Sequence, residues 1–418
     1  MFRKLLSGLT STAVVAGLAT AGAVAVAAPA AAVDTFNIPP YKDSQNNPTL
    51  ASQCGLDFGL VLDASGSIGD TGIANLKTAA DAFVDALVDT GSNVAVTSFS
   101  TGSPGDGGTN LEPTALTSAT LSTVKASYSG LQSNGWTNWR QGLQDMKDYY
   151  PPAKSWKPKL MVFITDGNPN TIDSNDGGAF SDGAKGAVDP AIDVANAMKL
   201  AGTKMFGIAV GRVSLNPIKA VTNEEAYTGT NFPTAGYVQT PDYQTLKQQL
   251  RELAVDLCAP SLTITKLADT PDTQGFQPAD GWTFDTTVTI PTAGKWVNPT
   301  TDAIAANVAS TKSADTANSG AVNFQWKPNS NVATDPVIVK ETLKSGYERD
   351  PQLVCKAKNI LANPPTERDI TPTVDGNGNW NLGSIGPREI VTCTAKNTLT
   401  QLKLAKTVSG GTAEAKDF

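Results

Sequence analysis

Short apolar runs alternate with stretches of helical periodicity between residues 53 and 259 of the 418-residue chain. Apolar residues recur at spacings of three and four from Ile73 to Leu87, which predicts an amphipathic helix. A last helix is predicted where leucines at helical spacing lead into Cys258. Continuous apolar runs predict buried strands at 58–62, 94–99, 159–165 and 205–210. Strands that alternate with helices predict an α/β fold with a doubly wound, mostly parallel sheet.

The hydrophobic pattern changes at residue 260, where helical periodicity ends. Threonine, valine, proline and glycine dominate from there to about residue 400, and apolar and polar residues alternate in short runs. Such alternation predicts strands at 262–266, 282–285, 322–326, 337–341 and 391–397. The second domain, residues 260–400, is therefore expected to be an all-β, antiparallel sandwich.

A cluster of oxygen-bearing side chains follows the first predicted strand. Asp63, Ser65 and Ser67 are spaced by two, so an extended turn points them to one side, and Gly66 lets the loop curl tightly. Ligands of open α/β sheets bind at the carboxyl ends of the strands. Hard cations such as Mg²⁺ take oxygen ligands. The pattern indicates a metal site, although a serine-rich turn that caps the following helix would show the same residues.

Asp63-Ala64-Ser65-Gly66-Ser67 resembles the D-x-S-x-S motif of the metal-ion-dependent adhesion site in von Willebrand factor type A (vWA) domains. The resemblance covers residues 53–259. It implies a threonine and a second aspartate from later loops, and Thr137 and Asp166 match them. It also implies a bound divalent cation, with Mg²⁺ favoured and Mn²⁺ or Ca²⁺ as substitutes, whose last position is taken by an acidic residue of a protein ligand.

The β-rich region resembles the prealbumin-like, Cna B-type stalk domains of bacterial surface proteins and pili. The matching residues are Lys266 on the first strand, Glu341 in the 340–347 segment and Asn397 on the last strand. The resemblance implies an intramolecular isopeptide bond between Lys266 and Asn397, assisted by Glu341. The alternative is that these are ordinary strand residues, since Ser345 stands where the group often has proline.

The net charge, the lack of histidine and the four cysteines of the chain exclude several kinds of partner and site. The formal net charge is −7, which argues against nucleic acid and anionic membrane surfaces as partners. The chain contains no histidine, which excludes catalytic Ser-His-Asp sites and zinc sites with nitrogen ligands. Four cysteines in an exported chain predict two disulfides with three possible pairings. Local pairing, Cys54–Cys258 and Cys355–Cys393, is the economical choice.

The two ends of the chain carry further signals. Residues 1–32 begin with Arg3 and Lys4, continue with a run of small apolar residues and end in alanines, which predicts a secretory signal peptide. An uncleaved membrane anchor is the alternative. Residues 33–52 read as an extended linker. Residues 401–418 repeat the L-x-[IL]-x-K spacing of the sandwich's first strand, so we expect a further, truncated β-domain and a longer natural product.

These patterns predict a secreted or cell-surface adhesin of the bacterial cell wall or pilus. The vWA domain would be a non-enzymatic head that binds an extracellular-matrix or cell-surface protein, and the sandwich would be its stalk. The alternative is a structural component whose metal serves stability or assembly with other pilus or cell-wall subunits. An enzyme that uses the metal as a Lewis acid is a remote third reading.

Overall fold

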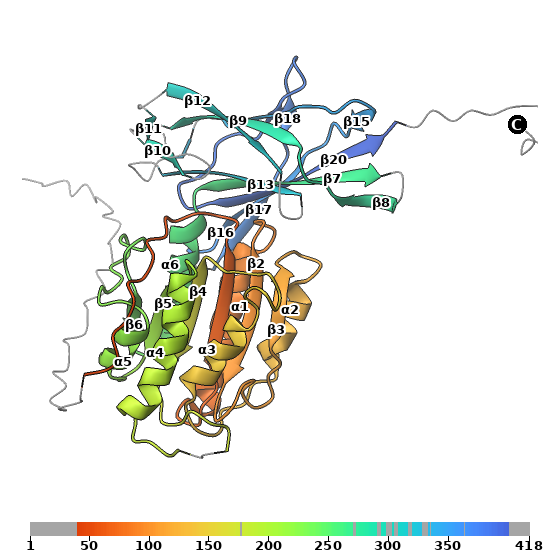
Figure 1. Cartoon of the computed structure of the whole chain (residues 1–418). Helices are drawn as coiled ribbons and strands as arrows, with labels where there is room; N and C mark the ends of the chain where they lie inside the picture. The colour runs from red at the N-terminus through yellow and green to blue at the C-terminus, as the bar shows by residue number, and fades with distance from the viewer. Residues whose placement is uncertain are drawn as a thin grey trace, which may run out of the picture. The chain divides into compact units, whose positions relative to one another are not determined.

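The computed structural model shows an α/β head followed by a β-sandwich (Figure 1). The signal peptide, the start of the predicted linker and the predicted C-terminal β-domain lie outside the described residues. The structure describes residues 40–400 except 176–177, 271–272, 291–293, 298–302, 305–307, 317–319, 328–332, 335 and 363.

The head contains a six-stranded sheet with the strand order β3-β2-β1-β4-β5-β6. All neighbouring strands are parallel except β2 and β3, which confirms the predicted doubly wound, mostly parallel sheet. The direction of winding reverses between β1 and β4, which is where such sheets bind ligands. The strands are β1 (Asp57–Asp63), β2 (Asn93–Phe99), β3 (Leu111–Ala115), β4 (Leu160–Thr165), β5 (Lys204–Val210) and β6 (Tyr237–Thr240).

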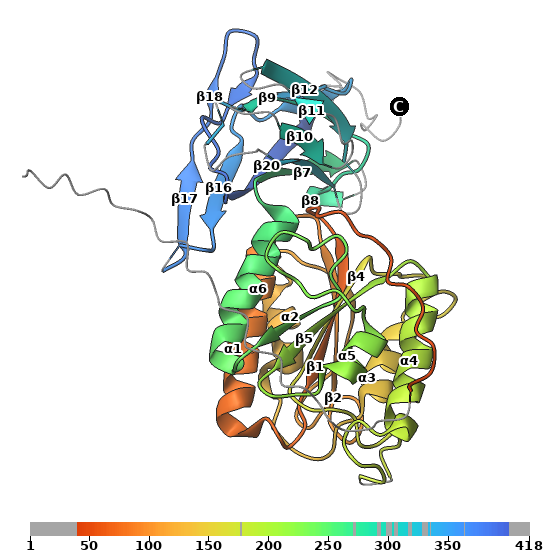
Figure 2. The ribbon, with the colours of Figure 1, turned by 90° about the vertical axis from the view of Figure 1, so that its left-hand side faces the viewer.

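Six helices cover the two faces of this sheet within the described part of the head (Figure 2). The buried side chains of α1, α2 and α6 pack on one face, and those of α3, α4 and α5 pack on the other. The helices are α1 (Gly69–Leu87), α2 (Leu121–Ser129), α3 (Trp139–Lys147), α4 (Lys185–Leu200), α5 (Leu215–Val221) and α6 (Tyr243–Cys258).

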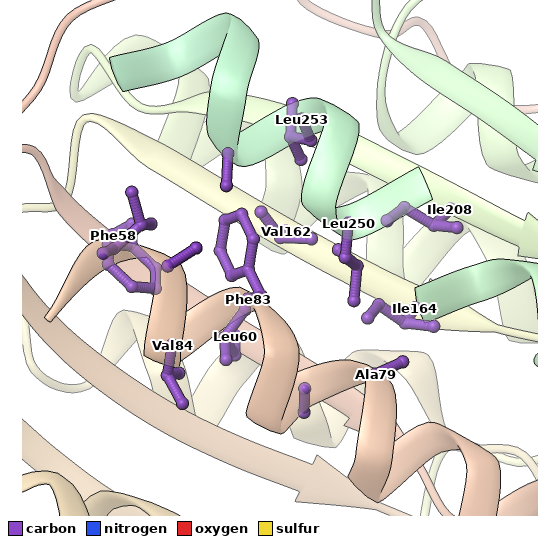
Figure 3. Packing of buried hydrophobic residues seen from close by; sticks show 14 of the residues in the cluster. Phe58, Leu60, Ala79, Phe83, Val84, Val162, Ile164, Ile208, Leu250 and Leu253 are labelled. Atoms are coloured by element: carbon purple, nitrogen blue, oxygen red, sulfur yellow. The ribbon is translucent and has the colours of Figure 1, made fainter. Parts of the chain in front are cut away.

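The larger core of the head lies between the sheet and the neighbouring helices α1 and α6, which run in the same direction (Figure 3). Phe83 of α1 packs edge-on against Phe58 of β1, with ring centroids 5.4 Å apart. Leu250 and Leu253 of α6 cover the same side of the sheet. The apolar stripe predicted for α1, from Ile73 to Leu87, is buried, and burial of such side chains is what holds a helix of this kind on a sheet.

The second domain consists of a nine-stranded and a five-stranded sheet whose facing side chains form one core. Pairing is antiparallel except between the first strand and the last, β7 and β20, which are parallel neighbours. The strands are β7 (Ser261–Thr270), β8 (Thr273–Pro278), β9 (Thr283–Ile290), β10 (Gly294–Val297), β11 (Ala303–Ile304), β12 (Val308–Asp315), β13 (Ala321–Lys327), β14 (Ile338–Glu341), β15 (Tyr347–Arg349), β16 (Val354–Asn359), β17 (Thr366–Ile370), β18 (Thr373–Val374), β19 (Trp380–Asn381) and β20 (Ile390–Leu399).

The described part of the predicted linker, residues 40–52, contains no helix or strand and binds along the head. The backbone N–H of Gln45 donates to Asn196 Oδ1 on α4 at 2.7 Å. The side chain of Asn47 exchanges two hydrogen bonds with the backbone of Met205 on β5, each 2.7 Å long. Because side-chain amides replace backbone pairing here, the segment is fixed without a regular element.

Both cysteine pairs form disulfides in the structure. Cys54, three residues before β1, is bonded to Cys258, the last residue of α6. Cys355 and Cys393 face each other on the neighbouring strands β16 and β20. Each disulfide therefore closes a loop within its own domain.

Candidate functional site

Asp63 is the last residue of β1, and its side chain is completely buried. The backbone N–H of Ser65 donates to Asp63 Oδ1 at 2.7 Å. The hydroxyl of Thr165, the last residue of β4, donates to Asp63 Oδ2 at 2.6 Å. Both carboxylate oxygens are thus held in place by groups from the two strands that flank the switch point of the sheet.

Ser65, Ser67 and Asp166 lie beside Asp63 at this edge of the sheet. The hydroxyls of Ser65 and Ser67 are 3.2 Å apart, and the Ser67 hydroxyl donates to Asp166 Oδ1 at 2.7 Å. Ser65 is buried, Asp166 is half-buried and Ser67 is exposed. The set therefore runs from the protein interior to the surface, as an accessible ligand site requires.

Thr137 joins the same cluster from the loop before α3. A Cβ placed on Gly167 would lie 3.4 Å from Thr137 Oγ1 and 3.5 Å from Ser67 Oγ, so both hydroxyls line the small space beside this glycine. The structure thus brings together all five residues that the sequence predicted, Asp63, Ser65, Ser67, Thr137 and Asp166.

Backbone hydrogen bonds connect two of the three loops that carry these residues. Gly66 N–H donates to Gly135 O at 3.0 Å, and Asn134 N–H donates to Ala64 O at 3.0 Å. These two bonds align the first loop with the loop that carries Thr137. The position of the hydroxyls thus follows from main-chain pairing, which a short motif in the sequence does not reveal.

Asn170 is a positioning residue that the sequence analysis missed. Its side-chain Oδ1 accepts from the Thr137 N–H at 2.8 Å, and its own N–H donates to Thr137 O at 3.1 Å. Its side-chain amide also donates to Asp182 Oδ1 at 2.9 Å. Asn170 therefore fastens the Thr137 loop to the loop that follows Asp166. The only sequence signal is its place in the aperiodic stretch after that aspartate.

The electrostatics of the cluster favour a cation. Burial, followed by the charge of Asp166, raises the pKa of Asp63 to about 7. Burial also raises the pKa of Asp166. No positively charged side chain of the described residues contributes to either shift. Two adjacent carboxylates without a counter-charge are destabilising, and a divalent cation would relieve this.

The donor set fits a hard divalent cation, since it offers two carboxylates and three hydroxyls. In the part of the chain that the structure describes, no group of three or more acidic or cysteine side chains forms another metal-binding cluster. The candidate site differs from such clusters, because only two of its five donor side chains are acidic and the other three are hydroxyls.

Aromatic residues lie on both sides of Thr137. Trp139 is fully buried in the core, and its indole N–H donates to Gly167 O at 3.2 Å. Trp136 is 45% exposed. Gly178, in the loop after Asp166, lies against the Trp136 indole, because a Cβ there would come within 2.7 Å of ring carbons. Trp136 thus forms an apolar rim next to the cluster, and that loop borders it.

A second polar cluster lies inside the β-sandwich. Lys266 on β7 and Asn397 on β20 are fully buried, and the Glu341 side chain reaches them from β14 of the other sheet. Lys266 Nζ donates to Glu341 Oε1 at 2.6 Å, and Asn397 Nδ2 donates to the same oxygen at 2.9 Å. Burial lowers the pKa of Lys266. The structure thus places the three predicted residues together.

Comparison with known proteins gives one family. Residues 57–248 match the family model described as von Willebrand factor type A domain. No curated protein matches the chain. Within the described residues, no helix combines the length and the apolar character needed to cross a membrane.

Several solved structures are similar to the chain at low identity. Proximal thread matrix protein 1 from the mussel byssus is 16% identical, with a TM-score of 0.37, over 52% of this chain and 53% of that chain. The pilus adhesin SpaC from Lactobacillus rhamnosus GG is 12% identical, with a TM-score of 0.38, over 85% and 57%. A von Willebrand factor type A protein from Catenulispora acidiphila is 14% identical, with a TM-score of 0.36, over 85% and 71%. The chain therefore spans only about half the length of the mussel protein.

Proposed function

Residues 57–248 form a von Willebrand factor type A domain, and from this premise we propose that the protein is a secreted or surface-displayed bacterial adhesin. Its head binds a protein ligand through a divalent cation, and the β-sandwich serves as its stalk. The observation that carries the proposal is the convergence of a buried carboxylate, a half-buried carboxylate and three hydroxyls at the switch point of the sheet. No positive counter-charge is among the described groups that act on the two acids.

Each residue of the cluster has a defined part in this proposal. Ser65, Ser67 and Thr137 offer neutral hydroxyl oxygens, while Asp63 and Asp166 hold the cation directly or through water. When bound, the cation supplies a Lewis-acidic position for a carboxylate from the ligand. Because three of the five protein donors are neutral hydroxyls, the cation stays electron-poor and can accept that carboxylate. Mg²⁺ fits a small site with few carboxylates, and Mn²⁺ or Ca²⁺ would substitute.

The test is cation-dependent adhesion of the full chain to extracellular-matrix and cell-surface preparations. Asp63→Ala should abolish binding that the wild type shows in Mg²⁺, and EDTA should do the same. Glu224→Gln is the matched control, because it removes an exposed carboxylate elsewhere on the head. Adhesion that persists in EDTA would contradict the proposal, provided that circular dichroism shows all variants folded.

The second candidate is a structural pilus or cell-wall component whose metal serves stability or assembly. In that case Asp63→Ala would lower the melting temperature in Mg²⁺ or impair assembly, while adhesion to host preparations would be absent from the wild type as well. Hydrolytic turnover that Asp63→Ala abolishes would instead indicate an enzyme. The absence of histidine from the chain argues against that outcome.

For the sandwich we propose an isopeptide bond between Lys266 and Asn397. Glu341 Oε1 lies within hydrogen-bond distance of both the lysine nitrogen and the amide nitrogen that would leave. Proton transfer from Lys266 to Glu341 gives a neutral amine, which attacks Asn397 Cγ. The new N–C bond replaces the bond to Nδ2. Glu341 gives its proton to Nδ2 as ammonia leaves and takes the second proton of the attacking nitrogen, so that a neutral amide and one ammonia are formed.

Intact mass spectrometry tests this bond. The wild type should be lighter than its sequence by one ammonia beyond the hydrogens lost to the two disulfides. Glu341→Gln keeps the size of the side chain but removes the proton carrier, so its mass should show no loss of ammonia. An unshifted mass for the freshly folded wild type rejects the bond.

A further inference from the structure

The ring of Tyr243, the first residue of α6, continues the buried stripe of this helix, but neither the stripe nor the predicted metal motif accounts for its buried hydroxyl. Its ring packs against the first turn of α1: a Cβ on Gly72 would lie 3.1 Å from Tyr243 Cδ2 and 3.4 Å from Cε2. That turn directly follows the loop of Ser65 and Ser67. The side chain is only 8% exposed.

The Tyr243 hydroxyl has no hydrogen-bond partner among the described residues. A buried hydroxyl without a partner destabilises the folded state, so one that persists requires an explanation. Asp166 and Asp63 are the two charged groups that act on this phenol, and both raise its pKa in addition to the effect of burial. The phenol thus lies at the end of α1 that follows the loop of Ser65 and Ser67, where the charges of both carboxylates reach it.

We propose that Tyr243 is a further positioning residue of the metal site, whose hydroxyl hydrogen-bonds to the oxygen shell around the bound cation. The proposal rests on the proposed metal-binding function of the same site. The phenol would donate to a water molecule on the cation or to a carboxylate oxygen that holds it. Groups in this outer shell orient the ligands of a metal and strengthen its binding. The missing partner of the hydroxyl is thus supplied when the cation is present.

The decisive variant is Tyr243→Phe in the full chain, because it keeps the packed ring and removes only the hydroxyl. We expect Mg²⁺ to bind about 10-fold more weakly by isothermal titration calorimetry. In EDTA the free energy of unfolding should be unchanged or higher, since the metal-free hydroxyl has no partner to lose. A tyrosine difference absorption on addition of Mg²⁺ should appear in the wild type and disappear in Tyr243→Phe.

Tyr150→Phe is the matched control. Tyr150 is also 8% exposed, but its hydroxyl is hydrogen-bonded to Thr203 Oγ1 at 2.6 Å. Thr203 directly precedes β5, at the edge of the sheet opposite the metal site. This variant should lower the stability in EDTA and leave Mg²⁺ affinity unchanged, which is the reverse of the pattern expected for Tyr243→Phe.

The outcomes separate this inference from the function on which it rests. If the wild type binds Mg²⁺ and Tyr243→Phe binds it equally well, the inference is overturned while the metal site stands. A loss of stability in EDTA for Tyr243→Phe would also overturn it, because the hydroxyl would then have a partner without the metal. If the wild type binds no Mg²⁺, Mn²⁺ or Ca²⁺, the proposed function itself fails.

Discussion

Asp63 combines complete burial, two hydrogen bonds and a neighbouring carboxylate, and these features link metal binding to protonation. Its pKa is raised from 3.8 to about 7, so the metal-free folded state keeps a proton that the unfolded chain has already lost. Protonation of Asp63 therefore stabilises the metal-free folded state. This contribution is complete below about pH 4 and is lost as the pH rises through about 7. A cation competes with that proton, so Mg²⁺ should bind more tightly at pH 8 than at pH 5.

Asp63→Asn should remove this pH dependence. In metal-free buffer, the stability of the variant relative to the wild type should rise by roughly 2–3 kcal/mol between pH 5 and pH 8, since the amide cannot ionise. Urea unfolding at the two pH values measures the change. A constant difference between variant and wild type would show that Asp63 titrates normally in the folded head.

Among single residues, the sequence predicted the site residues that belong to a recognisable motif. Asp63, Ser65 and Ser67 lie within five consecutive residues, and Asp166 follows a recognisable strand, so these oxygen donors could be predicted. Asn170 and Tyr243 could not, because each acts through a contact with residues far along the chain. Their side chains are ordinary for a loop and for the first turn of a helix.

Asn170→Ala should weaken Mg²⁺ binding without removing any oxygen donor of the site. It deletes the acceptor of the Thr137 N–H and the link to Asp182, so the Thr137 loop keeps only the backbone half of its paired hydrogen bonds with residue 170. We expect about a 10-fold loss of affinity by calorimetry. Asn175→Ala is the control, because Asn175 lies in the same loop and its side-chain amide donates to Asp173 Oδ1 at 3.2 Å. The Mg²⁺ affinity of this variant should equal that of the wild type.

At the level of elements, periodicity predicted the long helices and the buried strands and missed the less regular ones. The helix α2 has only three buried residues, Val124, Ser127 and Tyr128, which is too few for a clear pattern. The strand β3 lies at the edge of the sheet and has no fully buried residue. The helix α4 begins at Lys185 and contains Pro190. Small residues such as alanine dominate α4 and hide its periodicity.

The two disulfides should differ in how much they stabilise their elements. Cys54 and Cys258 are 204 residues apart, and Cys355 and Cys393 are 38 apart. The chain-entropy relation gives about 5 kcal/mol for the longer loop and about 4 kcal/mol for the shorter one. Paired Cys→Ala variants, compared by denaturant unfolding of each domain, measure both values. A larger loss for Cys355→Ala with Cys393→Ala would contradict the entropic account.

For the whole molecule, the parallel pairing of β7 and β20 is the feature that the sequence could not provide. Alternation predicts strands but not their neighbours, and an antiparallel sandwich was expected throughout. In the structure Lys266 lies opposite Ala395 and Asn397 lies opposite Ala268, so the first and last strands of the sandwich run side by side. A force applied at the two ends of this domain therefore loads these strands in shear.

Single-molecule pulling should detect the proposed isopeptide bond in this geometry. With Lys266 joined to Asn397, the chain between them cannot extend. Glu341→Gln should release roughly 90 residues outside the Cys355–Cys393 loop, which corresponds to ~300 Å of added length. A wild type that shows the same extension as Glu341→Gln would have no bond between the strands.

The covalent attachment of α6 limits how this helix can respond to events at its other end. The last residue of α6, Cys258, is disulfide-bonded to the segment just before β1. Its first residue is Tyr243, the phenol on which the charges of the two site aspartates act. Because the disulfide holds the C-terminal end of α6, the helix can tilt about that end but cannot shift along its axis. Occupancy of the site should therefore reach this helix as a change of tilt, and reducing conditions would add the freedom to translate.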